Sequence, residues 1–269
     1  MFLNIIKGIL IGGANVIPGV SGGTVAFILG IYEFLTEAIG NFFICTWNDR
    51  RKYFKFLMEI GSGVLIGIII FAKVIAFFYD NFQTQTQFFF VGLIIISLKI
   101  ILEENQEKIE NNSRISFLLG FVFIILVSYI GNLYSNETNQ IVLNQKYYLK
   151  LYISGLIAGS SMVVPGLSGS LILVILGEYE NILNLINKKE MLAIFFVLIG
   201  SLSGILLITK FIDFLLKRYK NVFIFFLIGM ISASIFAMIP TYKSIFQLTN
   251  IISVIFGISL VIFFKRYKR

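Results

Sequence analysis

The chain has 269 residues, of which 58% are hydrophobic and 13% are charged, and its net charge is +8. Because an ordinary soluble domain has about a quarter charged residues, this composition excludes a soluble protein and predicts an integral membrane protein. Histidine is absent and Cys45 is the lone cysteine, which excludes a disulfide framework, a multi-cysteine metal site and histidine-based catalysis. We therefore expect no catalytic residue, no metal site and no cofactor.

The first predicted element is a helical hairpin over residues 3–36, interrupted by Pro18 and a group of glycines. Proline ends a helix because it lacks an amide donor and its ring clashes with the preceding turn. Each arm is shorter than the roughly 17–25 residues that a full crossing requires, so the pattern favours a re-entrant hairpin. No small-residue cleavage site follows the apolar stretch, and no cleavable signal peptide is expected.

Apolar segments then continue to the end of the chain and divide it into two similar halves. Residues 1–146 contain the hairpin and three predicted transmembrane helices, near 54–79, 88–103 and 115–131. Residues 147–269 contain a second hairpin at 150–185 and helices near 191–216, 221–239 and 246–264. The predicted fold is therefore an all-α integral membrane protein built from two repeats.

The repeat is visible in the residues themselves. Residues 8–33 and 155–180, which are 147 positions apart, share twelve identical residues among 26. At an offset of 137, residues 65–73 match 202–210 and residues 88–92 match 225–229, whereas the last helices match only in hydropathy. The hairpin and the two helices after it are duplicated.

Basic residues indicate how each half is oriented, since loops on the cytoplasmic side of a membrane are rich in Lys and Arg. One basic cluster precedes the first full span and contains Arg50, Arg51, Lys52 and Lys55. A second follows the corresponding span of the second half and contains Lys217, Arg218 and Lys220. A third ends the chain and contains Lys265, Arg266, Lys268 and Arg269. All three are cytoplasmic only if the halves are inverted, which is typical of secondary transporters. Both termini are then cytoplasmic, and the positive charge requires no nucleic acid.

The two hairpin tips carry the clearest candidate site. Their sequences are Pro-Gly-Val-Ser-Gly-Gly at 18–23 and Pro-Gly-Leu-Ser-Gly-Ser at 165–170. Glycines let the backbone approach a ligand, and a helix that starts at membrane depth offers amide groups to an anion. The candidate binding residues are Asn15, Pro18, Gly19, Ser21, Gly22, Gly23 and Thr24 in the first tip, and Gly166, Ser168, Gly169 and Ser170 in the second. The glycines outside the tips, including Gly8, Gly12, Gly30, Gly155, Gly159 and Gly177, are interpreted as packing residues.

Two pairs of charged residues also occupy matched repeat positions. Lys73 and Lys210 lie inside apolar spans, where a cation either binds a functional partner or extends its stem to the interface. We include both as candidate phosphate ligands. Glu33 and Glu180 end the two hairpins and could couple transport to H⁺ or Na⁺, or could be ordinary interfacial carboxylates. The unmatched Glu59, Glu178 and Asp213 are expected near the interfaces.

Residues 11–33, IGGANVIPGVSGGTVAFILGIYE, resemble the signature of the polyprenyl-phosphate transporter family. The resemblance implies that undecaprenyl phosphate is carried from the outer to the cytoplasmic leaflet of the bacterial inner membrane, for reuse in cell-wall synthesis. The second tip departs from this signature at Met162, Ser170 and Leu171, so the two tips are not expected to be equivalent. From the residues alone, a carrier of a small anion and an intramembrane enzyme acting on lipid phosphates remain as alternatives.

Overall fold

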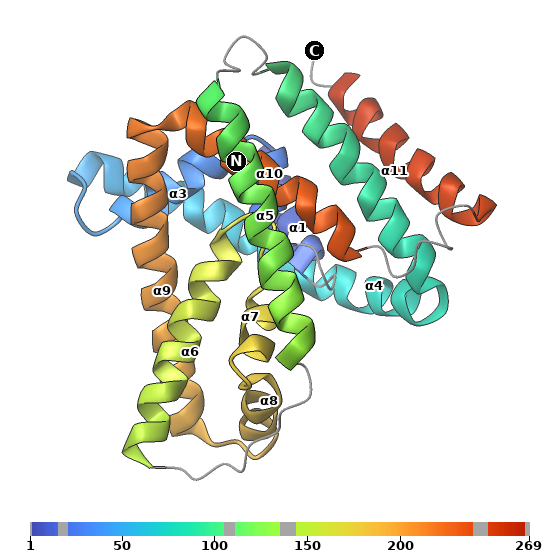
Figure 1. The fold of residues 1–269 in the computed structure, drawn as a ribbon. Helices are drawn as coiled ribbons and strands as arrows, with labels where there is room; N and C mark the ends of the chain where they lie inside the picture. Colours follow the sequence, from blue (N-terminus) through green and yellow to red (C-terminus); the bar gives the residue numbers. More distant parts are fainter. Residues whose placement is uncertain (1, 16–20, 105–110, 135–143, 239–246, 267–269) are drawn as a thin grey trace.

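The computed structural model describes residues 2–15, 21–104, 111–134, 144–238 and 247–266, and in these ranges it contains helices and no strand. The predicted all-α class is confirmed. The helices are α1 (Phe2–Asn15), α2 (Gly22–Ile28), α3 (Tyr32–Asn41), α4 (Trp47–Glu104), α5 (Asn111–Tyr134), α6 (Gln145–Val163), α7 (Gly169–Ile175), α8 (Tyr179–Asn187), α9 (Met191–Arg218), α10 (Lys220–Met238) and α11 (Leu248–Arg266) (Figure 1).

Four segments in the described part of the chain are long and apolar enough to cross a membrane: 47–74, 81–103, 112–131 and 191–218. A fifth is reached if α7 and α8, which are bent by 106° at a short break, count as one span. The described apolar parts of α10 and α11 are shorter. This arrangement is a multi-pass membrane protein.

The predicted helices near 54–79 and 88–103 are joined in the structure. The expected loop at 80–87 is helical, and α4 runs through it with one non-helical residue, Phe82, at φ −140° and ψ 42°. Two helical segments meet at this break, and residues 80–87 are helical on both sides of Phe82.

The second arm of each predicted hairpin is also divided. Gly30 and Gly177 both have φ of 66°, a left-handed conformation that favours glycine, and they separate α2 from α3 and α7 from α8. No atom outside the local chain lies within 4 Å of the position that a Cβ of Gly30 would occupy. The packing interpretation was therefore wrong for Gly30, whose role is to turn the backbone.

Packing is, by contrast, the role of the glycines in the first arms. The missing side chains of Gly8 and Gly12 let α1 contact the Ile60 and Val64 carbonyls of α4. Gly155 and Gly159 place α6 against Val197 and Ser201 of α9 in the same way. Such small residues allow helix backbones to approach closely inside a membrane. Figure 1 shows α6 and α9 side by side, with α8 near their lower end.

The remaining close helix pairs join one half to the other. Gly92 of α4 packs on Val254 of α11, and Gly229 of α10 packs on Phe117 of α5. The two contacts are repeat equivalents, because Gly229 is 137 positions after Gly92 and Phe117 is 137 positions before Val254. Gly120 on Phe226 and Gly257 on Phe89 repeat the same displacement. The last helix of each half thus follows the repeat in its packing as well as in its hydropathy.

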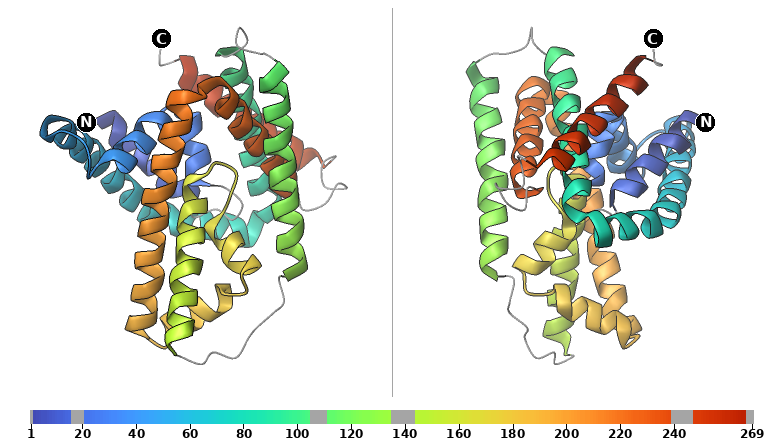
Figure 2. Two further views of the ribbon diagram at one scale, coloured as in Figure 1. Left: turned by 60° about the vertical axis from the view of Figure 1, so that its left-hand side comes forward. Right: turned by 90° about the vertical axis from the view of Figure 1, so that its right-hand side faces the viewer.

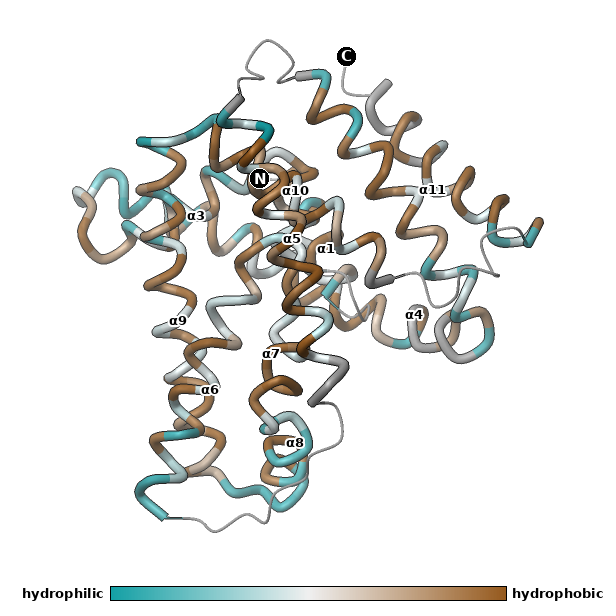
Figure 3. The backbone as a smooth tube through the Cα atoms, in the orientation of Figure 1, coloured by the Kyte–Doolittle hydropathy of each residue, from teal (hydrophilic) through white to brown (hydrophobic). Residues whose placement is uncertain are grey.

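The distribution of polarity fits a membrane environment. The centre of α10 is fully buried, with Leu227, Ile228 and Met230 at 0% exposure. Many large apolar side chains on the outer helices are exposed, for example Ile69 and Leu202. Hydrophilic residues gather near α8 and at the ends of α6 and α9, and apolar residues line the helices between them (Figure 3). In both views of Figure 2, α6, α8 and α9 extend below the rest of the molecule.

Candidate functional site

The two predicted tips contact each other in the structure. The Gly166 amide donates a hydrogen bond of 2.9 Å to Thr24 Oγ1, and the Ser21 hydroxyl donates a longer one of 3.4 Å to the Val164 carbonyl. Gly166 has φ of 83°, which turns its amide toward the first tip at no steric cost only because it is glycine. Segments that are far apart in the sequence therefore form one polar centre.

In the described part of the first tip, residues 21–24 are buried, and the Gly22 and Gly23 amides are already paired. The Gly22 amide donates to Asn15 Oδ1 at 3.0 Å, and the Gly23 amide donates to Ser21 Oγ at 3.2 Å. Ser21 and Thr24 are 6% and 2% exposed. The sequence predicted free amides here, whereas the structure shows side-chain oxygens in the places that anion oxygens would take. Pro18 and Gly19 lie outside the described residues.

The second tip is more open and less satisfied. The Ser168 and Ser170 hydroxyls are 2.7 Å apart, Ser170 is exposed, and the Ser168 side chain caps no amide of α7. Met162 lies over Gly169 where Asn15 lies over Gly22, because these residues are repeat equivalents. A thioether is only a weak acceptor. Asn15 therefore gives the first tip an internal cap that Met162 does not give the second.

The register of the helices sets the depth of the two lysines. The contacts of Gly155 and Gly204 show that α6 and α9 run parallel. A residue of α6 touches residues of α9 that are 42 to 48 positions later in the sequence. Val163, the last residue of α6, is therefore level with residues 205–211 of α9, a range that includes Lys210. In the first half, residues of α1 and α4 that touch are 52 to 58 positions apart in the sequence. Asn15 is therefore level with residues 67–73 of α4, and Lys73 is the last residue of that range. Both lysines lie at the level where the first hairpin arms end.

Neither lysine side chain forms a hydrogen bond or ion pair with any residue in the described part of the chain, and both residues are exposed. Gly40 of α3 packs directly on the backbone of Lys210, so the Lys210 stem leaves α9 beside the point where α3 crosses it. The structure thus places these side chains at the depth of the tips without joining them to a tip residue.

The two candidate coupling carboxylates differ in their surroundings. Glu33 Oε2 forms an ion pair of 2.6 Å with Lys220 Nζ at the start of α10, and both side chains are about half exposed. Glu180 is exposed on α8. This pairing matches the interpretation of Glu33 as an interfacial carboxylate.

Two buried polar clusters were not expected from the sequence. Asp213 accepts from Asn41 Nδ2 and from Lys217 Nζ, each at 2.8 Å, which ties the end of α3 to α9. Glu178 is fully buried and is paired with Lys150 and with the Tyr147 hydroxyl. Glu178 is therefore held by side chains from the first turns of α6. Desolvation and the neighbouring carboxylate raise the pKa of the Tyr147 phenol, so it remains a donor.

The sequence contained part of the signal for these clusters. Lys217 follows Asp213 by four positions, the spacing of an ion pair on one helix face. Glu178 stands directly after Gly177, at a bend that its hydrogen-bond partners stabilise. The partners themselves come from distant elements, and no local pattern identifies them.

The fold and the site define a multi-pass α-helical membrane protein in which two related interrupted helices meet end to end. Residues 11–263 match the family model described as undecaprenyl phosphate translocase-like, and the chain belongs to that family. A Vibrio cholerae polyprenyl-phosphate transporter is 31% identical, over 84% of this chain and 73% of that protein. A Staphylococcus aureus polyprenyl-phosphate transporter is 30% identical, over 97% of this chain and 92% of that protein. No solved structure matches.

Proposed function

We propose that this protein carries polyprenyl phosphate, in particular undecaprenyl phosphate, from the outer to the cytoplasmic leaflet of the bacterial inner membrane, where the lipid is reused in cell-wall synthesis. The single observation that carries the proposal is the contact between Thr24 and Gly166, which joins the two tips into one polar centre. The family membership and the names of the two relatives support the substrate.

The proposed mechanism follows from the cost of moving a phosphate through hydrocarbon. An anion without polar partners is strongly disfavoured there, whereas a polyprenyl chain is stable in lipid. The tips need to hold only the headgroup while the chain stays outside. In the first tip, phosphate oxygens would replace Asn15 Oδ1 and Ser21 Oγ as acceptors for the Gly22 and Gly23 amides. Lys73 and Lys210 supply the opposite charge at the same depth.

We further propose that the two halves are inverted repeats with re-entrant hairpins and that they expose the tips to each leaflet in turn. The helix contacts that recur at a displacement of 137 support equivalent halves, and the basic clusters support cytoplasmic termini. Coupling to H⁺ or Na⁺ would use Glu33 or Glu180. We propose transport without chemical conversion of the lipid, because the sequence contains no histidine to act as a base.

Transport in vesicles of purified protein tests the proposal. Ser21→Ala combined with Gly22→Leu should abolish movement of undecaprenyl phosphate between leaflets, because it removes one cap and fills the space over the Gly22 amide. Gly61→Leu with Ser62→Ala is the matched control, since open space surrounds Gly61 and the Ser62 hydroxyl bonds within α4. Transport by the double tip variant at the wild-type rate would contradict the assignment of the tips.

The same vesicles separate the alternative functions. Flux of inorganic phosphate that undecaprenyl phosphate does not inhibit would identify a carrier of a small anion. Conversion of undecaprenyl phosphate or its pyrophosphate by the wild-type protein in detergent would identify an enzyme. The proposal predicts neither result.

A further inference from the structure

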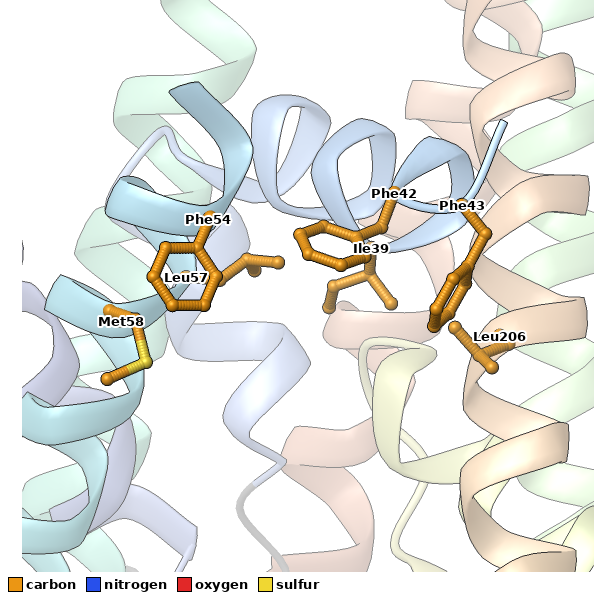
Figure 4. Close-up of a pocket in the computed structure, with 7 residues that line it drawn as sticks. All are labelled: Ile39, Phe42, Phe43, Phe54, Leu57, Met58 and Leu206. Atoms are coloured by element: carbon orange, nitrogen blue, oxygen red, sulfur yellow. The ribbon is translucent and has the colours of Figure 1, made fainter. Parts of the chain in front are cut away.

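An apolar recess of about 260 Å³ opens between the end of α3, the first turns of α4 and the middle of α9. Its lining is entirely hydrophobic, and Phe43, Phe54 and Met58 at its rim are 70%, 55% and 57% exposed. Figure 4 shows Ile39 and Phe42 on the α3 side and Leu206 on the α9 side of the same space. Aromatic rings from the end of α3 and from α4, together with Leu206 of α9, therefore surround a cleft that faces outward.

A cation lies next to this recess. Lys210 follows Leu206 by four residues, so the two side chains occupy neighbouring positions on one face of α9. Lys210 is exposed, and within the described ranges its ammonium has no hydrogen-bond or ion-pair partner. A charged group inside a membrane span is unfavourable without a partner, which makes this position one where an anion would be stabilising.

The wall of the recess is held in place independently of any ligand. Arg50 donates to the Phe42 carbonyl at 3.1 Å and to the Phe43 carbonyl at 3.2 Å, which fixes the turn between α3 and α4. Gly40 keeps α3 in contact with the backbone of Lys210. The apolar space and the cation thus belong to one preformed arrangement, whose α9 side lies at the level where α6 ends.

We propose that the recess and Lys210 form a lateral binding site for polyprenyl phosphate, with an isoprenoid segment in the recess and the phosphate on the Lys210 ammonium. The inference rests on the proposed function and specifies where the lipid binds beside the tips. The recess is smaller than the roughly 300–1,000 Å³ pockets that enclose whole ligands, so it takes a segment of a single chain. A single-chain lipid with a terminal phosphate fits this combination better than a phospholipid with two acyl chains.

Lipid binding measured by native mass spectrometry of the purified protein tests the site, with undecaprenyl phosphate as the probe. Lys210→Ala should weaken binding roughly tenfold or more, because it removes a charge-assisted contact, and Lys210→Arg should retain most of the affinity. Leu206→Trp should weaken binding by filling the recess. Ile69→Trp is its matched control on α4, since Ile69 stands 137 positions before Leu206 and is 74% exposed.

Equal affinity of Leu206→Trp and Ile69→Trp for undecaprenyl phosphate, or unchanged affinity of Lys210→Ala, would overturn this site. If the wild-type protein still transports the lipid, the proposed function remains intact. Displacement by phosphatidylglycerol at the same concentration as undecaprenyl phosphate would also overturn it, because the site would then be a general anionic-lipid site. A wild-type protein that neither binds nor moves undecaprenyl phosphate would remove both proposals.

Discussion

In the first half of the molecule α3 crosses onto α9 of the second half, whereas α8, its counterpart, contacts α7 and α9 of its own half and makes no comparable contact with α4 in the described residues. In the α1–α4 and α6–α9 pairs, the glycine contacts nevertheless occur at equivalent repeat positions, as Gly8 on Ile60 and Gly155 on Val197 show. The equivalent helix pairs α1–α4 and α6–α9 thus hold α3 and α8 in different places. On the proposed topology, the contact that α3 makes with α9 of the other half lies toward the cytoplasmic side.

The polar contacts follow the same asymmetry. Asn41 and Asp213 join α3 to the opposite half, while Lys150 and Glu178 join α6 to the α7–α8 bend within one half. None of these side chains has an equivalent of the same type in the other repeat. Helix packing is therefore the shared property of the repeats, and the buried polar contacts distinguish them.

The largest effect is expected at the shared packing glycines. Gly12→Leu and Gly159→Leu should each prevent recovery of folded protein, because the added side chain meets a backbone carbonyl of α4 or α9 that cannot move aside. Size-exclusion chromatography of the detergent-solubilised protein measures this, with Gly61→Leu as the control in open space. A monodisperse peak for only one of the two variants would contradict the claim that the two halves pack in an equivalent way.

A smaller loss of stability is expected at the ion pair between Lys150 and the buried Glu178 in the second half. Lys150→Met should lower the free energy of unfolding by about 1–3 kcal/mol, because the buried Glu178 loses the charged donor of the half-exposed Lys150. Adding Glu178→Gln should restore part of the loss. Thermal unfolding in detergent measures both, and Lys146→Met, one turn earlier and exposed, is the control. Equal effects of the two lysine variants would show that the pair is not stabilising.

The contact between α3 and α9 should respond to loss of one hydrogen bond. Asn41→Ala removes the amide that donates to Asp213 and should make Cys45, which follows α3, react several-fold faster with a maleimide. Asn187→Ala on α8 serves as the control, because it is exposed at the end of the corresponding helix. An unchanged labelling rate in Asn41→Ala would mean that the α3–α9 contact does not depend on this bond.

The smallest effect is expected at the exposed pair between Glu33 and Lys220. Because both side chains are about half exposed, Glu33→Gln should change the stability by less than about 1 kcal/mol. Transport under imposed H⁺ and Na⁺ gradients tests a second role for Glu33. A loss of gradient dependence at unchanged stability would assign Glu33 to coupling, and unchanged dependence would leave only the ion pair.

Periodic and compositional features could be predicted from the sequence, because they depend on local physics. Apolar length indicated the spans, and the repeat indicated the packing glycines of the first arms, such as Gly8 and Gly155, but not the turn at Gly30. The repeat in the last helices could also have been recognised, since Ile115, Ser116 and Gly120 match Ile252, Ser253 and Gly257 at the same displacement of 137.

Tertiary features could not be predicted in this way. That the Gly22 amide is capped by Asn15, seven residues earlier, depends on how the chain folds back at the first tip. The partners of Glu178 and Asp213 come from other helices, so their burial follows from packing alone. The recess beside Lys210 exists only because α3 crosses α9, and no sequence pattern announces that crossing.

The most direct measurement compares two conservative variants of buried threonines in the vesicle transport assay. Thr24→Val keeps the side-chain volume but removes the acceptor for the Gly166 amide, whereas Thr36→Val removes a hydroxyl that bonds only within α3. If the joined tips form the phosphate site, Thr24→Val should lower the rate of undecaprenyl phosphate transport at least tenfold and Thr36→Val should stay within about twofold of the wild type. Equal rates for the two variants would contradict the account.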